Sequence, residues 1–409
     1  METQNMSITL GHLSISDQGK QYVNQCLNEN RLSRGRFTER FEKEFSRLHK
    51  SKHGIFCNSG TSALQMALAT LKERYNYKDG DEVLVPAITF IATSNVVLQN
   101  NLTPIFVDVD PLTFNIDPDK IAEKVTDRTR AILPVHLFGL PANMPRIMSI
   151  AHWYGLDVIE DSCETMFAGI NGKSVGSFGD MACFSTYVAH LIVGGVGGLV
   201  TTNDPVYADM CRSLMAHGRD SIYTSIDDDD KISKDMIERR YKFDRVGYSY
   251  RCTEIEAAIA LSELERWKEN IATRRSNAAL LMSLLKPLED KLQLPSVPEG
   301  FSHSWMMFPL VCREGVDREP LLMHLENNGI ETRYLFPLLS QPVYRKLFPG
   351  MIEKYTVAKS LEKQGFFIGS HQGLYNRDIH FIAKTITEVY APSNDCSIRS
   401  FSRYLWWLR

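Results

Sequence analysis

The 409-residue chain has a net charge of −3, with 44% hydrophobic and 23% charged residues, which is typical of a globular protein with a large domain and a smaller one. Without a basic excess, no overall field attracts nucleic acid or an anionic membrane. The longest apolar run, residues 191–200, is too short to span a bilayer, and the first six residues lack signal-peptide features. We therefore expect a cytoplasmic protein without a membrane span or a nucleic-acid partner.

Cysteine spacing argues against metal chemistry. The chain has eight cysteines, none of them separated by only one or two residues, and most lie in apolar segments as reduced, buried cysteines do. We expect no metal ion and no iron–sulfur cluster.

The first half of the chain alternates between predicted helices and strands. Two amphipathic helices are predicted before residue 50, one opening at Ser16 and one over 38–48. Short apolar strands are predicted at 54–57, 82–85, 104–107, 131–135 and 157–161, with helices at 63–71, 95–99 and 144–154. This alternation predicts an α/β fold with a mostly parallel central sheet, in which ligands bind beyond the carboxyl ends of the strands.

The second half is less regular. Two strands, 181–186 and 199–202, flank a glycine-rich turn that carries His190, and a helix and a polar loop with four aspartates follow over 204–235. One long helix is predicted at 254–269, and 270–391 predicts a smaller α+β domain. We expect an N-terminal arm and large cofactor-binding domain over 1–265, a small C-terminal domain over 266–391 and a tail over 392–409. The tail is expected to be poorly ordered or packed, with docking on a surface or contact with a membrane interface through its two tryptophans and three arginines as the alternative.

Several candidate ligand residues follow predicted strands. Ser59, Gly60, Thr61 and Ser62 stand at a helix start, where free backbone N–H groups bind phosphate, although the same residues also cap helices without a ligand. Ser185 ends the strand before His190 and is a possible second phosphate donor.

Three further residues have a ligand role or a plainly structural one. Asp161 ends an apolar strand, where its carboxylate suits a protonated ring nitrogen or caps a helix. Phe90 follows another strand and either stacks on a ring or packs in the core. His190 is either a packed core residue or the residue that carries the chemistry.

These motifs together resemble the DegT-type nucleotide-sugar aminotransferases, pyridoxal phosphate enzymes of the aspartate-aminotransferase fold (fold type I). The resemblance covers about residues 8–390 and is carried by the segments at 58–64 (Asn-Ser-Gly-Thr-Ser-Ala-Leu), 85–93 (Val-Pro-Ala-Ile-Thr-Phe-Ile-Ala-Thr), 158–161 (Val-Ile-Glu-Asp) and 247–254 (Gly-Tyr-Ser-Tyr-Arg-Cys-Thr-Glu). It implies a homodimer with active sites at the subunit interface.

The resemblance also implies roles for single residues. The phosphate site would be Gly60, Thr61, Ser62 and Ser185, with Phe90 stacking on the cofactor ring and Asp161 pairing its nitrogen. Glu164 falls near the cofactor's phenolic oxygen, where the family usually has Gln or His. Ser249 stands where the family usually has an Asn that contacts the phosphate across the dimer.

His190 is the main departure from the family, which has there the lysine that forms a Schiff base with the cofactor. Imidazole cannot form a stable imine, and no lysine lies between Lys173 and Lys231. Histidine at this position resembles a subgroup, the pyridoxamine-phosphate-dependent sugar 3-dehydratases, which hold the cofactor noncovalently. The segments 304–309, 332–336 and 341–342 resemble the same subgroup.

The resemblance implies removal of the C3 hydroxyl from a nucleotide-linked 4-keto-6-deoxy sugar, with His190 as acid–base and glutamate as amino donor. An imidazole suits proton exchange at neutral pH. An aminotransferase-like reaction, an engineered lysine-to-histidine replacement and a non-catalytic cofactor-binding homologue remain alternatives. The sequence does not identify the nucleotide, the sugar or the regenerating donor.

Overall fold

The computed structural model describes residues 8–220, 234 and 241–390. The polar loop expected around 225–231 and the tail expected over 392–409 lie outside these described residues. Across the described ranges, every helix falls short of the length and apolar character that a membrane span requires.

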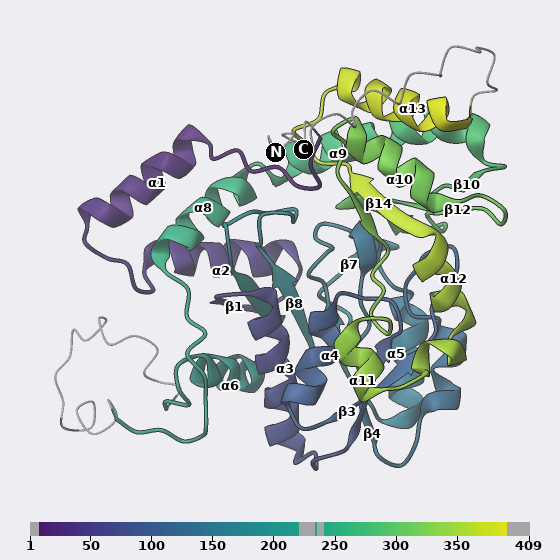
Figure 1. Ribbon diagram of the computed structural model, residues 1–409. Coiled ribbons are helices and arrows are strands. Elements are labelled where there is room, and N and C mark those ends of the chain that lie inside the picture. Colours follow the sequence, from purple (N-terminus) through teal and green to yellow (C-terminus); the bar gives the residue numbers. More distant parts are fainter. Residues whose placement is uncertain (1–7, 221–233, 235–240, 391–409) are drawn as a thin grey trace, which may run out of the picture.

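A seven-stranded sheet forms the centre of the larger part of the molecule, with strand order β1-β9-β8-β5-β4-β2-β3 (Figure 1). Its strands are β1 (His53–Cys57), β2 (Glu82–Pro86), β3 (Thr103–Val107), β4 (Thr129–Ile132), β5 (Asp157–Asp161), β8 (Met181–Ser185) and β9 (Gly198–Thr202). β9 pairs antiparallel with both β8 and β1, whereas the remaining pairs are parallel. The mostly parallel sheet that the alternating pattern predicts is thus present.

Helices cover both faces of this sheet, which explains why its strands read as apolar runs. Side chains alternate between the faces, so that Val83 and Val85 pack in one core cluster with α3 (Gly60–Tyr75) and α4 (Ile91–Gln99). Leu84 packs on the other face, in a second cluster with α5 (Met144–Tyr154). Helix α6 (Pro205–Met215) packs beside α3.

A four-stranded sheet, with order β10-β12-β14-β13, forms the smaller part of the molecule (Figure 1, green and yellow). Its elements are β10 (Leu292–Gln293), β12 (Met307–Cys312), β13 (Thr332–Tyr334) and β14 (Gly365–Gly369), with helices α10 (Arg318–Asn327), α11 (Pro342–Leu347), α12 (Thr356–Gln364) and α13 (Asn376–Tyr390). All three strand pairs are antiparallel. A small third sheet joins β6 (Gly169–Ile170), β7 (Lys173–Ser174) and β11 (Phe301–Ser302).

The single helix predicted over 254–269 is wrong in one respect, because the chain forms two helices there. They are α8 (Glu254–Glu265) and α9 (Trp267–Leu285), and Arg266 between them leaves the helical conformation at φ −104° and ψ 7°. The apolar pattern continues across Arg266, so periodicity alone did not reveal the break.

The N-terminal arm consists of α1 (Asp17–Asn28) and α2 (Arg36–Leu48), both packed against α8. The carboxylate of Glu254, at the start of α8, accepts hydrogen bonds from the backbone N–H groups of Phe37 and Thr38 at the start of α2. Before the arm, Ile8 pairs with Ile330, and the Leu10 N–H donates to Glu331 at 2.9 Å. The beginning of the chain is therefore fastened to residues more than 200 positions later.

Candidate active site

A cavity of about 970 Å³ opens at the carboxyl edge of the large sheet. Its walls come from the ends of β1, β2, β5 and β8 and, across the opening, from the small sheet. Seven of the nine residues predicted from the sequence line it: Gly60, Thr61, Phe90, Asp161, Glu164, Ser185 and His190. These seven residues therefore lie together at the edge of the sheet where ligands bind in such folds.

The start of α3 forms one end of the cavity. Ser59 caps the helix, since its hydroxyl accepts from the Ser62 N–H at 3.0 Å, which leaves the N–H groups of Gly60 and Thr61 facing outward from the first turn. A Cβ at Gly60 would stand 2.7 Å from the Cys163 sulfur and 2.9 Å from the Ser185 Cβ. Only glycine lets the turn approach the neighbouring strand ends this closely, and the Ser185 hydroxyl is thereby brought beside the helix N-terminus.

Asp161, the last residue of β5, is buried in the cavity floor. Its carboxylate accepts from the Thr93 hydroxyl at 2.8 Å and from the Cys163 N–H at 3.2 Å. Burial raises the pKa of Asp161 above its usual range, against the lowering effect of these hydrogen bonds. A cationic ring nitrogen beside the carboxylate would offset the cost of burial and favour its ionised form.

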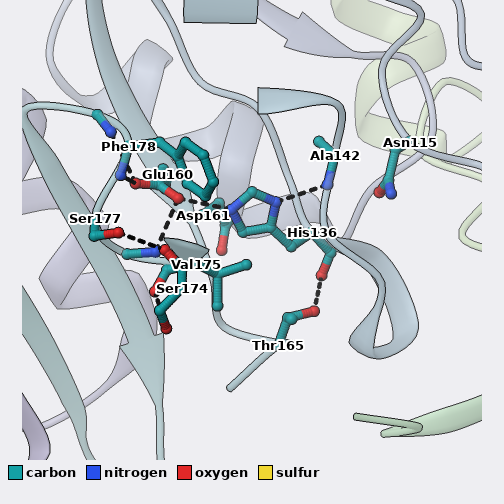
Figure 2. A network of polar contacts seen from close by, with 12 residues as sticks. Asn115, His136, Ala142, Glu160, Asp161, Thr165, Ser174, Val175, Ser177 and Phe178 are labelled. Atoms are coloured by element: carbon teal, nitrogen blue, oxygen red, sulfur yellow. Dashed lines mark hydrogen bonds and ion pairs between the residues drawn. The ribbon is translucent and has the colours of Figure 1, made fainter. Parts of the chain in front are cut away.

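A buried histidine–carboxylate pair lies behind Asp161 (Figure 2). His136 Nδ1 accepts from the Ala142 N–H at 2.9 Å, so its proton lies on Nε2, which faces Glu160 at 3.1 Å. Glu160 also accepts the N–H groups of Gly176, Phe178 and Gly179 at 2.7–2.8 Å. Both side chains are fully buried; the pair ties β5 to the loop after β4, and the N–H groups that Glu160 accepts tie β5 to the loop before β8.

Two more predicted residues complete the floor and one side wall. Glu164 is 7% exposed and accepts from the Phe138 N–H at 2.9 Å; burial raises the pKa of Glu164 to about 8, so it carries a proton at neutral pH. Phe90 is 56% exposed and meets Phe336 edge-on at 6.4 Å. Core packing, the structural alternative for Phe90, does not account for so exposed a ring.

His190 lies on the loop between β8 and β9, in a short turn in which its N–H donates to the Tyr187 carbonyl at 2.9 Å. The residue is half-buried, yet its Nδ1 is shielded from solvent and has no hydrogen-bond partner. Burial, together with the nearby Arg274 guanidinium, lowers the pKa of His190 to about 4. The imidazole is therefore neutral at neutral pH and has an unused ring nitrogen.

The opposite wall comes from the small sheet and the segment after it. Its polar residues are Glu331, Arg333, Tyr334 and Gln341, three of them within the segments that resemble the 3-dehydratases. Arg333 Nη2 donates to Glu331 at 2.6 Å and the Arg333 side chain is 56% exposed. Among the described residues that line the cavity, Arg333 is the only arginine and there is no lysine.

Two predicted residues are not part of these walls. The hydroxyl of Ser62 faces back to Ser59, which donates to it at 2.9 Å, so Ser62 helps to shape the helix start. Ser249 is exposed and accepts from Arg251 at 3.3 Å. Its expected role across a dimer interface stays a prediction.

Sequence reasoning assigned no role to Thr93 or Arg274. Thr93 ends the matched segment 85–93, and its bond to the Asp161 carboxylate requires the fold to bring residues 68 positions apart together. Arg274 lies just beyond the helix predicted over 254–269, in the region predicted as a smaller α+β domain, and carries no motif. Neither position could be linked to the site without the tertiary structure.

The chemistry of the cavity suits a pyridoxal-type cofactor. Two outward N–H groups and a hydroxyl stand at one end for a phosphate, and a buried carboxylate stands on the floor for a ring nitrogen. An exposed aromatic ring stands at the side, and His190, the only histidine among the described lining residues, has an unpartnered Nδ1. These observations concern this chain's residues alone and fit noncovalent retention of the cofactor.

Comparison with known proteins agrees with this geometry. The family model for the DegT/DnrJ/EryC1/StrS aminotransferase family matches residues 14–387. GDP-perosamine synthase of Caulobacter vibrioides is 36% identical over 374 residues, covering 90% of this chain and 95% of that protein. GDP-4-keto-6-deoxy-D-mannose 3-dehydratase of Yersinia pseudotuberculosis is 32% identical over 360 residues, covering 86% and 90%.

Solved structures show the same fold. The GDP-4-keto-6-deoxy-D-mannose-3-dehydratase of E. coli with bound hydrated PLP superposes with a TM-score of 0.85 at 28% identity, covering 94% of this chain and 100% of that chain. The fold-type-I architecture expected from the sequence is thus confirmed.

Proposed function

Because the chain belongs to the DegT/DnrJ/EryC1/StrS aminotransferase family, we propose that it is a pyridoxamine-phosphate-dependent enzyme that removes the C3 hydroxyl of a nucleotide-linked 4-keto-6-deoxy sugar. That the chain is a pyridoxal-phosphate-class enzyme of nucleotide-sugar metabolism follows from the family and the fold. The choice of dehydration rests on one observation. His190 occupies the turn after β8 where the family has its lysine, and the described cavity lining offers no lysine in its place.

Each residue has a task in this proposal. Gly60, Thr61 and Ser185 bind the cofactor phosphate, Asp161 holds the ring nitrogen protonated, and Phe90 stacks on the ring. When bound, the cofactor supplies an amine for the sugar's 4-keto group and an electron sink for cleavage of the C3–O bond.

His190 is the acid–base. Its neutral imidazole accepts a proton on a ring nitrogen and returns it, a transfer that contributes roughly 10²–10⁴-fold in rate when the group is well placed. Protonated Glu164 is a hydrogen-bond donor for the cofactor's phenolic oxygen. Arg333, the only arginine among the described lining residues, supplies positive charge for the anionic nucleotide part of the substrate.

Product analysis tests the proposal. The protein is incubated with pyridoxamine phosphate, GDP-4-keto-6-deoxy-D-mannose and glutamate, and the sugar product is identified by mass spectrometry. We expect C3–OH to become C3–H while glutamate is oxidised to 2-oxoglutarate and ammonia is released. The C3 hydroxyl leaves as water, and the release of 2-oxoglutarate and ammonia consumes water, so that no net water is formed. A 4-amino sugar would instead identify a transaminase, and absence of turnover a non-catalytic homologue.

Transamination is the second candidate because the 36%-identical relative is a GDP-perosamine synthase. A borohydride test separates the two modes of cofactor retention. Reduction should leave no cofactor covalently attached to the protein, since His190 cannot form the lysine-type link. A reduced cofactor–lysine adduct would contradict the proposal.

We further propose that the protein is a homodimer in which Ser249 contacts the phosphate site of the partner subunit. Glutamate is the proposed amino donor, and the proposed location is the cytoplasm.

A further inference from the structure

Arg274, on α9, is fully buried between the His190 turn and the small sheet. Its Nη1 donates to the carbonyls of Trp305 and Met306 at 3.1 and 2.9 Å, and its Nε donates to Gln372 Oε1 at 2.9 Å. Its Nη2 lies 3.5 Å from the carbonyl oxygen of His190. One guanidinium thus connects the loop after β8 with the two segments that flank the small sheet.

This burial needs an explanation, because every one of these partners is electrically neutral. Among the described residues, no carboxylate lies within ion-pair distance of Arg274. Burial lowers the pKa of Arg274 to about 9, and the charge of Glu263 offsets only part of this effect. A buried charge without a paired counter-charge is costly. The guanidinium nevertheless remains protonated at neutral pH and places a positive charge behind the catalytic turn.

We propose that Arg274 is a positioning residue, which fixes the His190 turn against the small sheet and opposes protonation of its imidazole. The proposal rests on the acid–base role assigned to His190 in the proposed function. Arg274 does not line the cavity, so it acts through His190 and touches neither substrate nor cofactor.

Other charged and titratable groups also surround His190. Tyr187, on the same turn, meets the imidazole edge-on at 6.0 Å, and Asp161 and Glu164 line the same cavity from the end of β5. Ionised Asp161 would favour the protonated imidazole, whereas Glu164 is protonated at neutral pH and adds no charge; Arg274 from α9 opposes the effect of Asp161.

The remaining groups contribute little net charge. From the small sheet, Glu331 and Arg333 face the cavity as an ion pair. His371, which stacks on His12 at 5.4 Å, is buried beside Arg274; burial and that guanidinium lower the pKa of His371 to about 3. Arg274 therefore adds to the effect of burial in opposing protonation of His190, and it does so without entering the cavity.

The first test titrates His190 in protein without added cofactor, by NMR of ¹³C-labelled histidine, with the signal assigned by its loss in His190→Asn. Arg274→Met should raise the midpoint of the His190 titration by about one pH unit, a tenfold change in the protonation equilibrium. Arg274→Lys keeps the charge and should leave the midpoint within a few tenths of a unit. An unchanged midpoint in folded Arg274→Met would overturn the electrostatic part.

Arg275→Met is the matched control. Arg275 is the next residue on α9 and also bonds the small-sheet side, since its Nε donates to the His303 carbonyl at 2.9 Å, but no contact joins it to His190. Its loss should leave both the titration and the reaction unchanged. If Arg275→Met shifted the His190 titration midpoint as much as Arg274→Met does, the effect would come from disturbing α9 in general and the proposal for Arg274 would be wrong.

The second test measures steady-state kinetics. Arg274→Met should lower kcat at least tenfold with less than a twofold change in KM, and the acid limb of the pH–rate profile should move to higher pH. Gln372→Ala removes only the Nε acceptor and should lower kcat severalfold at an unchanged titration midpoint, which tests positioning even if Arg274→Met does not fold. Full activity in Gln372→Ala and in Arg274→Lys would overturn the positioning role.

The two proposals fail in distinguishable ways. The NMR titration needs neither cofactor nor substrate, so it reports on Arg274 whatever the product is. A 4-amino sugar product combined with a shifted midpoint would refute dehydration and leave the effect of Arg274 on His190 intact.

Discussion

His136 follows β4 and His190 follows β8, the two strands on either side of β5, yet their surroundings are opposite. His136 is completely buried, and both of its ring nitrogens are hydrogen-bonded, one to the Ala142 N–H and one to Glu160 (Figure 2). His190 faces the cavity with an unpartnered Nδ1. His136 is sealed from solvent with both ring nitrogens bonded to protein groups, which suits a structural role, whereas the free ring nitrogen of His190 at the cavity wall is available for proton transfer.

The largest effect expected from this contrast is the loss of activity in His190→Asn. Deoxygenation should fall by roughly 10²–10⁴-fold, because asparagine cannot exchange the proton. The melting temperature should stay within a few degrees, since no hydrogen bond of the native ring is lost at Nδ1. Product formation by mass spectrometry and thermal unfolding measure the two quantities, and Tyr187→Phe on the same turn is the control. Wild-type deoxygenation in His190→Asn would refute its role.

The reverse pattern is expected of Glu160→Gln. The amide nitrogen would face N–H donors that the carboxylate accepts, and breaking such a buried pair costs about 3–5 kcal/mol of the free energy of unfolding. Urea unfolding measures this loss, while turnover per folded molecule should fall less than tenfold. Glu353→Gln, in an exposed pair with Lys359, is the matched control and should cost less than about 1 kcal/mol. If Glu160→Gln and Glu353→Gln destabilised the protein equally, the structural role assigned to the His136–Glu160 pair would be wrong.

A smaller effect is expected on the opposite wall. Arg333→Met removes the cavity's only arginine among the described lining residues and should raise KM for the nucleotide sugar about tenfold, equivalent to one charged hydrogen bond. The rate at saturating substrate should change little, because Arg333 stands away from the acid–base. Lys359→Met, far from the lining residues, is the control. An unchanged KM together with a reduced kcat would place Arg333 with the chemical machinery instead.

The smallest effect is a dependence of stability on pH. Burial is the main cause that lowers the pKa of His49 and His190 to about 4 and of His303 and His371 to about 3, all below the ordinary value of 6.5. The unfolded chain then binds more protons between about pH 6.5 and 4, so the free energy of unfolding should decrease as pH falls through this window. Each such histidine contributes up to about 1.4 kcal/mol per pH unit.

Glu164 should act in the opposite direction, because its raised pKa of about 8 gives stability that is present below pH 4.5 and lost as pH rises to 8. Urea unfolding at several pH values measures the combined effect of these groups on the free energy of unfolding. His190→Asn and Glu164→Gln each remove the contribution of one group. A free energy of unfolding that stays constant from pH 6.5 to 4.5 in the wild type would contradict the lowered histidine pKa values.

Sequence reasoning located the elements well where a pattern is local. The strands ending at Cys57, Val107 and Asp161 are predicted with the correct last residue, since apolar runs in a sheet covered on both faces end sharply at polar residues. His190 could be identified from the sequence because the neighbouring motifs align its position with the lysine of the family. The break at Arg266 escaped prediction because it changes backbone angles without interrupting the apolar pattern.

Contacts between distant segments could not be predicted. Thr93 bonds Asp161 from the first turn of α4, and Arg274 reaches His190 from a helix 84 positions away. Their residue types are common on helices, so nothing local distinguishes them. The Glu160–His136 pair is likewise invisible in sequence, because its partners gather only when β5 and the following loop are folded.

The fastening of the chain's beginning to its far end has a consequence for synthesis on the ribosome. The first turn of α2 is capped by Glu254, and Leu10 is held by Glu331. The arm cannot be completed until about 200 residues beyond Ser59 have been translated, and the cavity wall around Phe367 until about 300 have, which takes roughly 15–60 s at ordinary elongation rates. During that interval the half-built sheet exposes its apolar surface, and the nascent protein is a natural client for chaperones.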